Sequence, residues 1–133
     1  MTTSARSIRI LAVALTAGSL AVALGIRVTR GSVLDSDNPL NQISGTILYA
    51  AAVYGAVLFL FPRSRPLVVA VYAAGFCWLV ELFQLTGLPA AWSAQSVLAR
   101  LALGAHFDPA DLAWYLAGVL PVAALHHFVT RRR

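Results

Sequence analysis

The sequence predicts an all-α membrane protein with four transmembrane helices and one short interfacial helix. Only 11% of the 133 residues are charged and 59% are hydrophobic, whereas soluble domains are about 25% charged. The apolar residues gather in four windows of 19 residues each, namely 8–26, 43–61, 67–85 and 111–129. At about 1.5 Å per residue, each window would span roughly 28 Å, which is close to the hydrocarbon thickness of a bilayer. We therefore expect a single membrane domain over residues 1–133.

The first window, 8–26, allows two interpretations. Arg6 and Arg9 precede an apolar run that contains Ala21-Val22-Ala23, a pattern that imitates a cleaved signal peptide. The apolar run continues to Ile26, however, which is longer than a usual signal sequence, and further membrane segments follow. We expect a retained transmembrane helix.

The second and third windows, 43–61 and 67–85, are predicted to form an antiparallel hairpin. Pro62 and Pro66 bracket a link of five residues, and proline stops a helix because it lacks the backbone donor. The first two turns of the second helix carry small or polar side chains on one face. These residues are Gln42, Gly45, Thr46 and Tyr49.

A weaker pattern covers approximately residues 90–103. Ser93, Ser96 and Arg100 recur on one side of a helix, and apolar residues gather on the opposite side. This segment is too short and too polar to cross a bilayer. It is typical of an amphipathic helix that lies at the interface.

The fourth window, 111–129, has a marked start. Asp108, Pro109 and Asp111 supply a cap, a proline at the first helical position and an acidic first turn. Pro121 is expected to kink this helix, and neighbouring helices in a bundle can absorb such a kink.

All ten basic residues are arginines, and their positions predict the orientation. Seven lie near the N-terminus, in the 62–66 link or at the C-terminus, and three lie in the other two loops. Because cytoplasmic loops carry the excess of basic residues, we expect a multi-pass protein of the inner (plasma) membrane with both termini in the cytoplasm. The net charge of +5 therefore reflects membrane topology, and nucleic acid is not an expected partner.

Glu81 is the most informative residue of the chain, because it lies within an otherwise uncharged transmembrane window. Placing a carboxylate at membrane depth costs about 2–3 kcal/mol on insertion scales. The predicted helix directions bring further polar residues to the same, outer end of the bundle, and Arg100 could bind the carboxylate in a bidentate way. The predicted polar cluster comprises Glu81, Gln84, Arg100, Asp111 and Tyr115.

The rest of the bundle is predicted to be almost wholly apolar. His126 and His127 are expected at the inner headgroups beside the terminal arginines. Cys77 is the only cysteine, so neither an intrachain disulfide nor a cysteine-based metal cluster can form. We expect no metal, no cofactor and no catalytic residue.

The motif residues resemble those of a known family. The run 81–85 (Glu-Leu-Phe-Gln-Leu), followed by Asp111-Leu112, Tyr115 and Gly118, resembles the bacterial domain-of-unknown-function family numbered 2809. The resemblance implies a small four-helix inner-membrane protein and no established activity. The family often has an acidic residue at the position of Thr46. A distant resemblance to VanZ-like membrane proteins, some of them linked to tolerance of glycopeptide antibiotics, is at the level of the fold.

Three functions remain open at this point. The first is a non-enzymatic envelope protein whose outer polar cluster binds a lipid headgroup, an envelope precursor or a membrane protein partner. The second is a membrane enzyme acting on a lipid-linked substrate, with Glu81 as general base and Asp111 and His106 assisting. The third is a small transporter subunit, which an apolar inner half would disfavour. Alternatively, a buried Glu81–Arg100 pair could serve helix packing alone.

Overall fold

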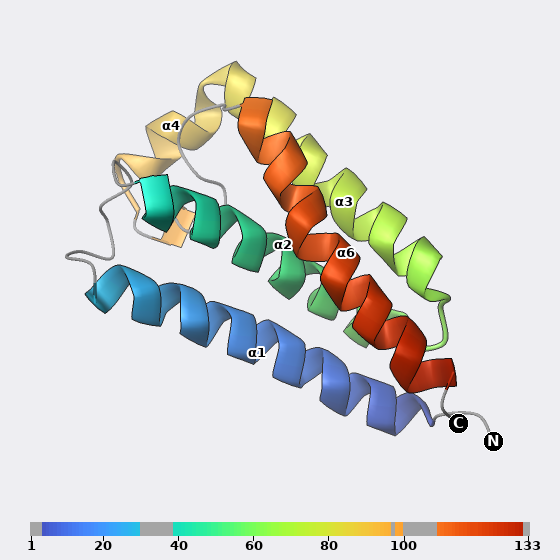
Figure 1. The fold of residues 1–133 in the computed structure, drawn as a ribbon. Coiled ribbons are helices and arrows are strands. Elements are labelled where there is room, and N and C mark those ends of the chain that lie inside the picture. Colours follow the sequence, from blue (N-terminus) through green and yellow to red (C-terminus); the bar gives the residue numbers. More distant parts are fainter. Residues whose placement is uncertain (1–3, 30–38, 97, 100–108, 132–133) are drawn as a thin grey trace.

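The computed structural model describes residues 4–29, 39–96, 98–99 and 109–131, and this part of the chain contains helices and no strand. Four long helices form a bundle (Figure 1). They are α1 (Ala5–Thr29), α2 (Pro39–Leu60), α3 (Pro66–Phe83) and α6 (Pro109–Arg131). Each is long and apolar enough to cross a membrane. The predicted all-α fold with four membrane-length helices is therefore confirmed.

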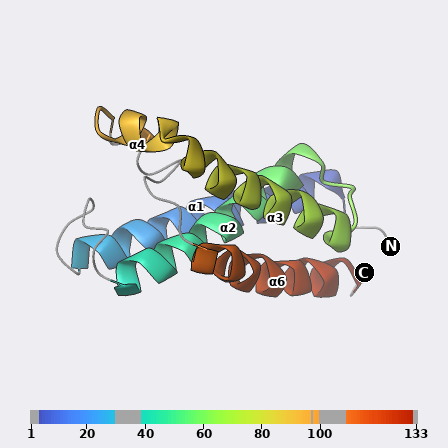
Figure 2. The same ribbon diagram turned by 90° about the horizontal axis from the view of Figure 1, so that it is seen from above.

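Helix α2 is the centre of the bundle. It packs against α1 on one side, while α6 packs against both α2 and α3 (Figure 2). The start of α1, the end of α6 and the α2–α3 link lie at one end of the bundle, and the start of α6 lies at the other end (Figure 1). This alternation follows from the tight link between Pro62 and Pro66 and from helices of similar length.

Two glycines allow the helices to approach closely. A side chain at Gly55 would meet the Ala12 carbonyl oxygen at 2.9 Å, where α1 contacts α2. A side chain at Gly118 would collide with the Ile47 carbonyl oxygen, where α6 contacts α2. Such small residues compensate for the weak hydrophobic driving force between helices in lipid, because they bring backbones into van der Waals contact.

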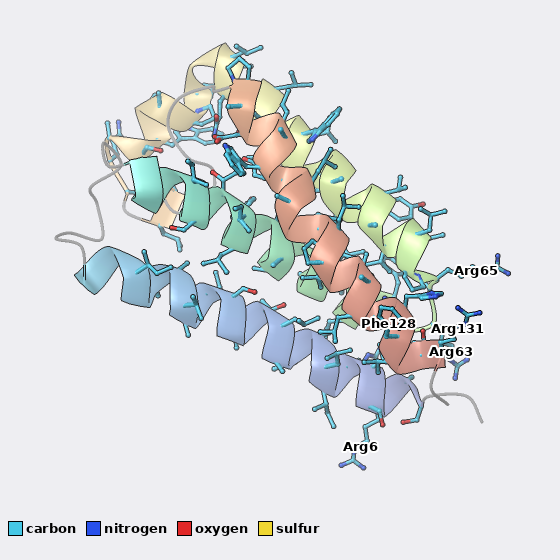
Figure 3. All side chains as sticks on the ribbon, in the orientation of Figure 1. Arg6, Arg63, Arg65, Phe128 and Arg131 are labelled. Atoms are coloured by element: carbon cyan, nitrogen blue, oxygen red, sulfur yellow. The ribbon has the colours of Figure 1, made fainter. Side chains whose placement is uncertain are left out.

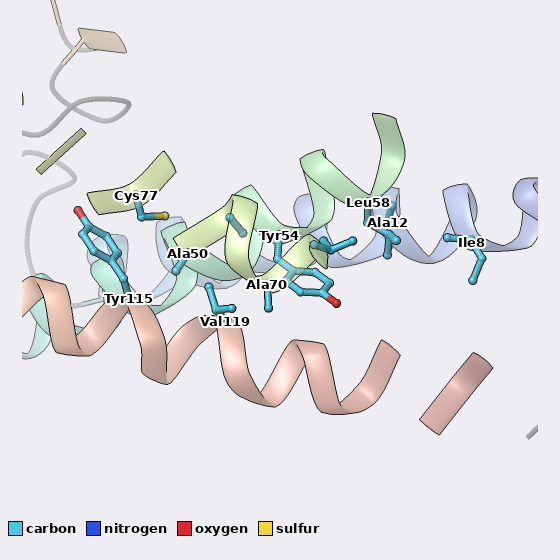
Figure 4. Close-up of a cluster of buried hydrophobic side chains, with 11 residues drawn as sticks. Ile8, Ala12, Ala50, Tyr54, Leu58, Ala70, Cys77, Tyr115 and Val119 are labelled. Carbon is cyan, nitrogen blue, oxygen red and sulfur yellow. The ribbon is translucent and has the colours of Figure 1, made fainter. Parts of the chain in front are cut away.

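The core contains side chains from α1, α2, α3 and α6 (Figure 4). On α3 the buried residues follow a single stripe, whereas large apolar residues cover the other faces. The buried stripe consists of Val69, Ala70, Ala73, Cys77, Val80 and Glu81. Exposed side chains such as Leu67, Val71 and Leu79 suit lipid rather than water.

The segment after α3 differs from the expected single helix over about 90–103. Helix α3 runs into a 3-10 turn, η1 (Gln84–Thr86), and Gly87 then takes the left-handed conformation with φ of 79°. Helix α4 begins at Leu88, earlier than expected, and ends at Ser93. Pro89 in its first turn favours the early start, and a turn follows at residues 94–95. Residues 100–103 lie outside the described part of the chain.

Candidate functional site

Glu81 lies on the buried stripe of α3 and is completely shielded from solvent. The hydroxyl group of Tyr115, on α6, donates a hydrogen bond of 2.8 Å to Glu81 Oε2. The Tyr115 side chain is only 5% exposed. Burying a carboxyl group costs less free energy when the group is hydrogen-bonded. The phenol therefore offsets part of the cost of burying a carboxyl group between α3 and α6.

Asp111 lies one helical turn before Tyr115 on the same buried face of α6. Thr46, in the early part of α2, donates a hydrogen bond of 3.3 Å to Asp111 Oδ1. Asp111 is in the first turn of α6, where the helix dipole favours a negative charge. This hydrogen bond connects the start of α6 to α2 and stabilises their contact.

Gln84 is also buried, in η1, three residues after Glu81. The ring of Tyr49, from α2, packs against the ring of Tyr115 with centroids 6.2 Å apart. Side chains from α2, α3, η1 and α6 therefore gather at one end of the bundle. We call this group the polar-end cluster, and it comprises Thr46, Glu81, Gln84, Asp111 and Tyr115.

Arg100, the fifth residue of the predicted site, lies outside the described residues, as do His106 and Asp108. The contact between Arg100 and Glu81 therefore stays a prediction. Within the described ranges, no three His, Cys, Asp or Glu side chains are grouped so that they could hold a metal ion. Cys77 is a buried free thiol.

All three tryptophans lie in α3, α4 and α6 near the polar-end cluster, and each is partly exposed. Trp78 Nε1 donates a hydrogen bond of 3.1 Å to the Leu112 carbonyl oxygen. The ring of Trp92 packs against Phe83 with centroids 5.8 Å apart. Trp114 lies next to Tyr115 in sequence. Tryptophan is enriched at membrane–water interfaces in general.

The opposite end of the bundle contains a buried polar pair, which contradicts the expectation of an apolar inner half. His126 is 1% exposed, and its Nδ1 lies 2.7 Å from the hydroxyl oxygen of Tyr54. The rings meet edge to face with centroids 5.9 Å apart. The expectation that His126 lies among the headgroups was therefore wrong, because its side chain points into the bundle.

The spacing of residues along α6 could have predicted that His126 is buried. Tyr115, Gly118 and His126 are separated by three and eight residues and share the buried face of the helix. His127, the next residue, is exposed. The position of His126 on the buried face of α6 thus indicated its burial better than its proximity to the C-terminus did.

Arginines collect at the end of the bundle where the Tyr54–His126 pair lies (Figure 3). Arg6, Arg63, Arg65 and Arg131 are at this end, and Arg9 donates a hydrogen bond of 3.1 Å to the Phe59 carbonyl oxygen. The two acidic residues within the described ranges, Glu81 and Asp111, belong to the opposite end. The bundle therefore has one basic end and one end with buried carboxyl groups.

The fold and the site define a multi-pass helical membrane protein, by helix length and composition, with a polar cluster buried at one end. The chain belongs to the family described as "Protein of unknown function (DUF2809)", whose model matches residues 36–119, more than half of the chain. The resemblance noted in the sequence is thereby confirmed. No curated protein and no solved structure matches the chain at a significant level. The matched region contains the whole polar-end cluster and excludes α1 and His126.

Proposed function

We propose that this chain is a non-enzymatic protein of the cell envelope whose polar-end cluster binds the headgroup of a lipid or of a lipid-linked precursor. The observation that carries the proposal is the wholly buried Glu81, held by Tyr115 at 2.8 Å within a membrane-length helix. Ionisable residues within membrane segments are costly and commonly mark functional sites.

The depth of the cluster supports a headgroup as the ligand. Trp78 lies one turn before Glu81, and Trp114 adjoins Tyr115. Tryptophan side chains favour the headgroup level, because the ring is apolar and its N–H needs a polar partner. A ligand that reaches the cluster at this level would be part of a lipid.

The chemistry of the cluster indicates which headgroups would suit it. Glu81 and Asp111 supply carboxyl oxygens, Thr46 and Tyr115 supply hydroxyl groups, and Gln84 supplies an amide. These groups hydrogen-bond to hydroxyl and ammonium groups. A headgroup rich in hydroxyl or amine groups is therefore the expected ligand class.

The basic end supports an orientation in which both termini face the cytoplasm of an inner-membrane protein. The arginines of this end lie near both termini and in the α2–α3 link. The positive-inside rule then assigns the polar-end cluster to the outer leaflet. An outer-leaflet lipid, an envelope precursor or a partner membrane protein would meet the cluster there.

Glu81→Gln tests this proposal in the host organism. Glutamine keeps an acceptor for the Tyr115 hydroxyl and removes the acidic group, so the helix contact should survive. A strain lacking the gene is screened against envelope stresses and complemented with the wild type or the variant. The proposal predicts that the variant reaches the membrane in normal amount and fails to complement. Full complementation would contradict it.

A small proton-linked transporter subunit is the second candidate, and the Tyr54–His126 pair favours it. Buried polar side chains occur towards both ends of the bundle, and Asp111, Tyr115 and His126 share one face of α6. Flux measured in reconstituted liposomes distinguishes this function from binding alone.

An enzyme acting on a lipid-linked substrate is the remaining alternative. Lipid profiling of the strain that lacks the gene would then show a missing lipid product.

A further inference from the structure

The buried pair at the basic end, Tyr54 and His126, has an incomplete set of hydrogen bonds. The Nδ1 atom of His126 meets the Tyr54 hydroxyl at 2.7 Å. The other ring nitrogen, Nε2, is buried and has no hydrogen-bond partner among the residues that the structure describes. Buried polar atoms are nearly always hydrogen-bonded, so an exception such as this Nε2 calls for an explanation.

A third polar group, the Pro66 carbonyl oxygen, lies close to the Tyr54–His126 pair. The Tyr54 hydroxyl also lies 3.5 Å from the Pro66 carbonyl oxygen, at the first residue of α3. A phenol has one hydrogen to donate and can also accept. Tyr54 can therefore donate to His126 Nδ1, or accept from Nδ1–H and turn its own hydrogen toward Pro66.

We propose that the Tyr54–His126 pair is a proton-binding site at the basic end of the bundle. In one neutral arrangement Tyr54 donates to Nδ1, and an added proton bonds to Nδ1 while the phenol hydrogen turns toward the Pro66 carbonyl. In the other, Nδ1–H already donates to Tyr54, and the added proton bonds to Nε2. Both routes give the same imidazolium, with Nδ1–H donated to the Tyr54 oxygen and Nε2–H as a second donor.

Proton binding should loosen this end of the bundle. In the charged ring, Nε2–H is a donor for which the described residues provide no acceptor. The charged groups at this end are cationic in the described part of the chain. They are Arg6 and Arg9 of α1, Arg63 and Arg65 of the α2–α3 link, and Arg131 of α6, with His127 as a further titratable neighbour. A positive ring there gains water or a new acceptor only if the α2–α6 contact opens.

The proton site is separate from the polar-end cluster. Figure 4 shows Tyr115 at one end of the core and Tyr54 nearer the middle, with Ala50 and Val119 between them. His126 follows Tyr115 by eleven residues, about 16 Å along a helix. Histidine is the side chain suited to this role, because its unperturbed pKa of about 6.5 lies in the physiological range.

Nuclear magnetic resonance of the ring nitrogens tests the proposal directly. The full-length protein is labelled with ¹⁵N-histidine, reconstituted in nanodiscs and titrated from about pH 8 to about pH 4, across and below the usual histidine range. His126→Gln and His127→Gln assign the signals. The proposal predicts that the His126 signals change from one neutral tautomer to the imidazolium, at a midpoint that moves in Tyr54→Phe. His126 signals that stay unchanged over the whole range would overturn it.

Thermal unfolding supplies a second measurement, which does not require the assignment of histidine resonance signals. The melting midpoint of the wild type and of His127→Gln should fall as the pH is lowered over the same range. In His126→Gln that fall should be at least halved, because no ring remains to charge. An equal fall in all three proteins would contradict the proposal.

Discussion

The Tyr115 hydroxyl lies 2.8 Å from Glu81 Oε2 and joins α6 to α3 at the polar end of the bundle. Both side chains are buried, and each belongs to the face of its helix that packs inward. The carboxyl group therefore faces protein rather than lipid. Glu81 is consequently the best point at which to probe both packing and function.

Tyr115→Phe should destabilise the protein by about 1–3 kcal/mol, because it removes the donor to a buried carboxyl group and leaves the ring in place. The measurement is unfolding by denaturant in detergent micelles. Tyr72→Phe is the matched control, since Tyr72 is on the exposed face of α3. Equal stability of the two variants would mean that the Tyr115–Glu81 bond contributes little.

Thr46→Val removes the hydroxyl that donates to Asp111 at 3.3 Å and keeps the side-chain shape. We expect a loss of about 0.5–1.5 kcal/mol. If the polar-end cluster acts as one network, the double variant with Tyr115→Phe should deviate from additivity by about 0.5 kcal/mol or more. Strict additivity would show two independent bonds.

Gly118→Ala should weaken the contact between α6 and α2, because the added methyl group collides with the Ile47 carbonyl oxygen. Overpacking of this kind costs about 1–3 kcal/mol. Gly75→Ala is the matched control, since a side chain there meets nothing within 4 Å. The melting midpoint of the Gly118 variant should fall, whereas that of the Gly75 variant should stay the same or rise. The reverse order would contradict the helix contact.

The proposed orientation predicts the labelling of single cysteines. In a Cys77→Ser background, Ser64→Cys in the α2–α3 link should react with an impermeant maleimide only after the cells are opened. Thr86→Cys, at the end of η1, should react in intact cells. The opposite pattern would place the polar-end cluster in the cytoplasmic leaflet.

The fold was largely predictable because the relevant signals are local. The four apolar windows predicted the four membrane-length helices, and Pro62 and Pro66 predicted the tight link between α2 and α3. Predicting the helix after α3 was less successful. Gly87 and Pro89 act on the backbone and start α4 at Leu88, whereas the amphipathic pattern suggested a later and longer helix.

The polar-end residues could be nominated from sequence, because Glu81 is conspicuous in an uncharged window and helix direction indicates its neighbours. The Tyr54–His126 pair was missed because each residue alone has an ordinary explanation. Tyrosine is common in membrane helices near interfaces, and a histidine close to terminal arginines suggests the headgroup region. Their bond depends on the rotation of α6 against α2, which no local pattern specifies.

Native mass spectrometry of the purified protein tests the central claim most directly, by identifying the lipids that stay bound after gentle removal from the membrane. Wild type, Glu81→Gln and the control Tyr72→Phe are compared at equal folded amount. The account predicts that wild type and control retain a lipid with a hydroxyl- or amine-bearing headgroup, and that Glu81→Gln loses at least nine-tenths of it. Equal retention of that lipid by all three proteins would contradict a headgroup site at Glu81.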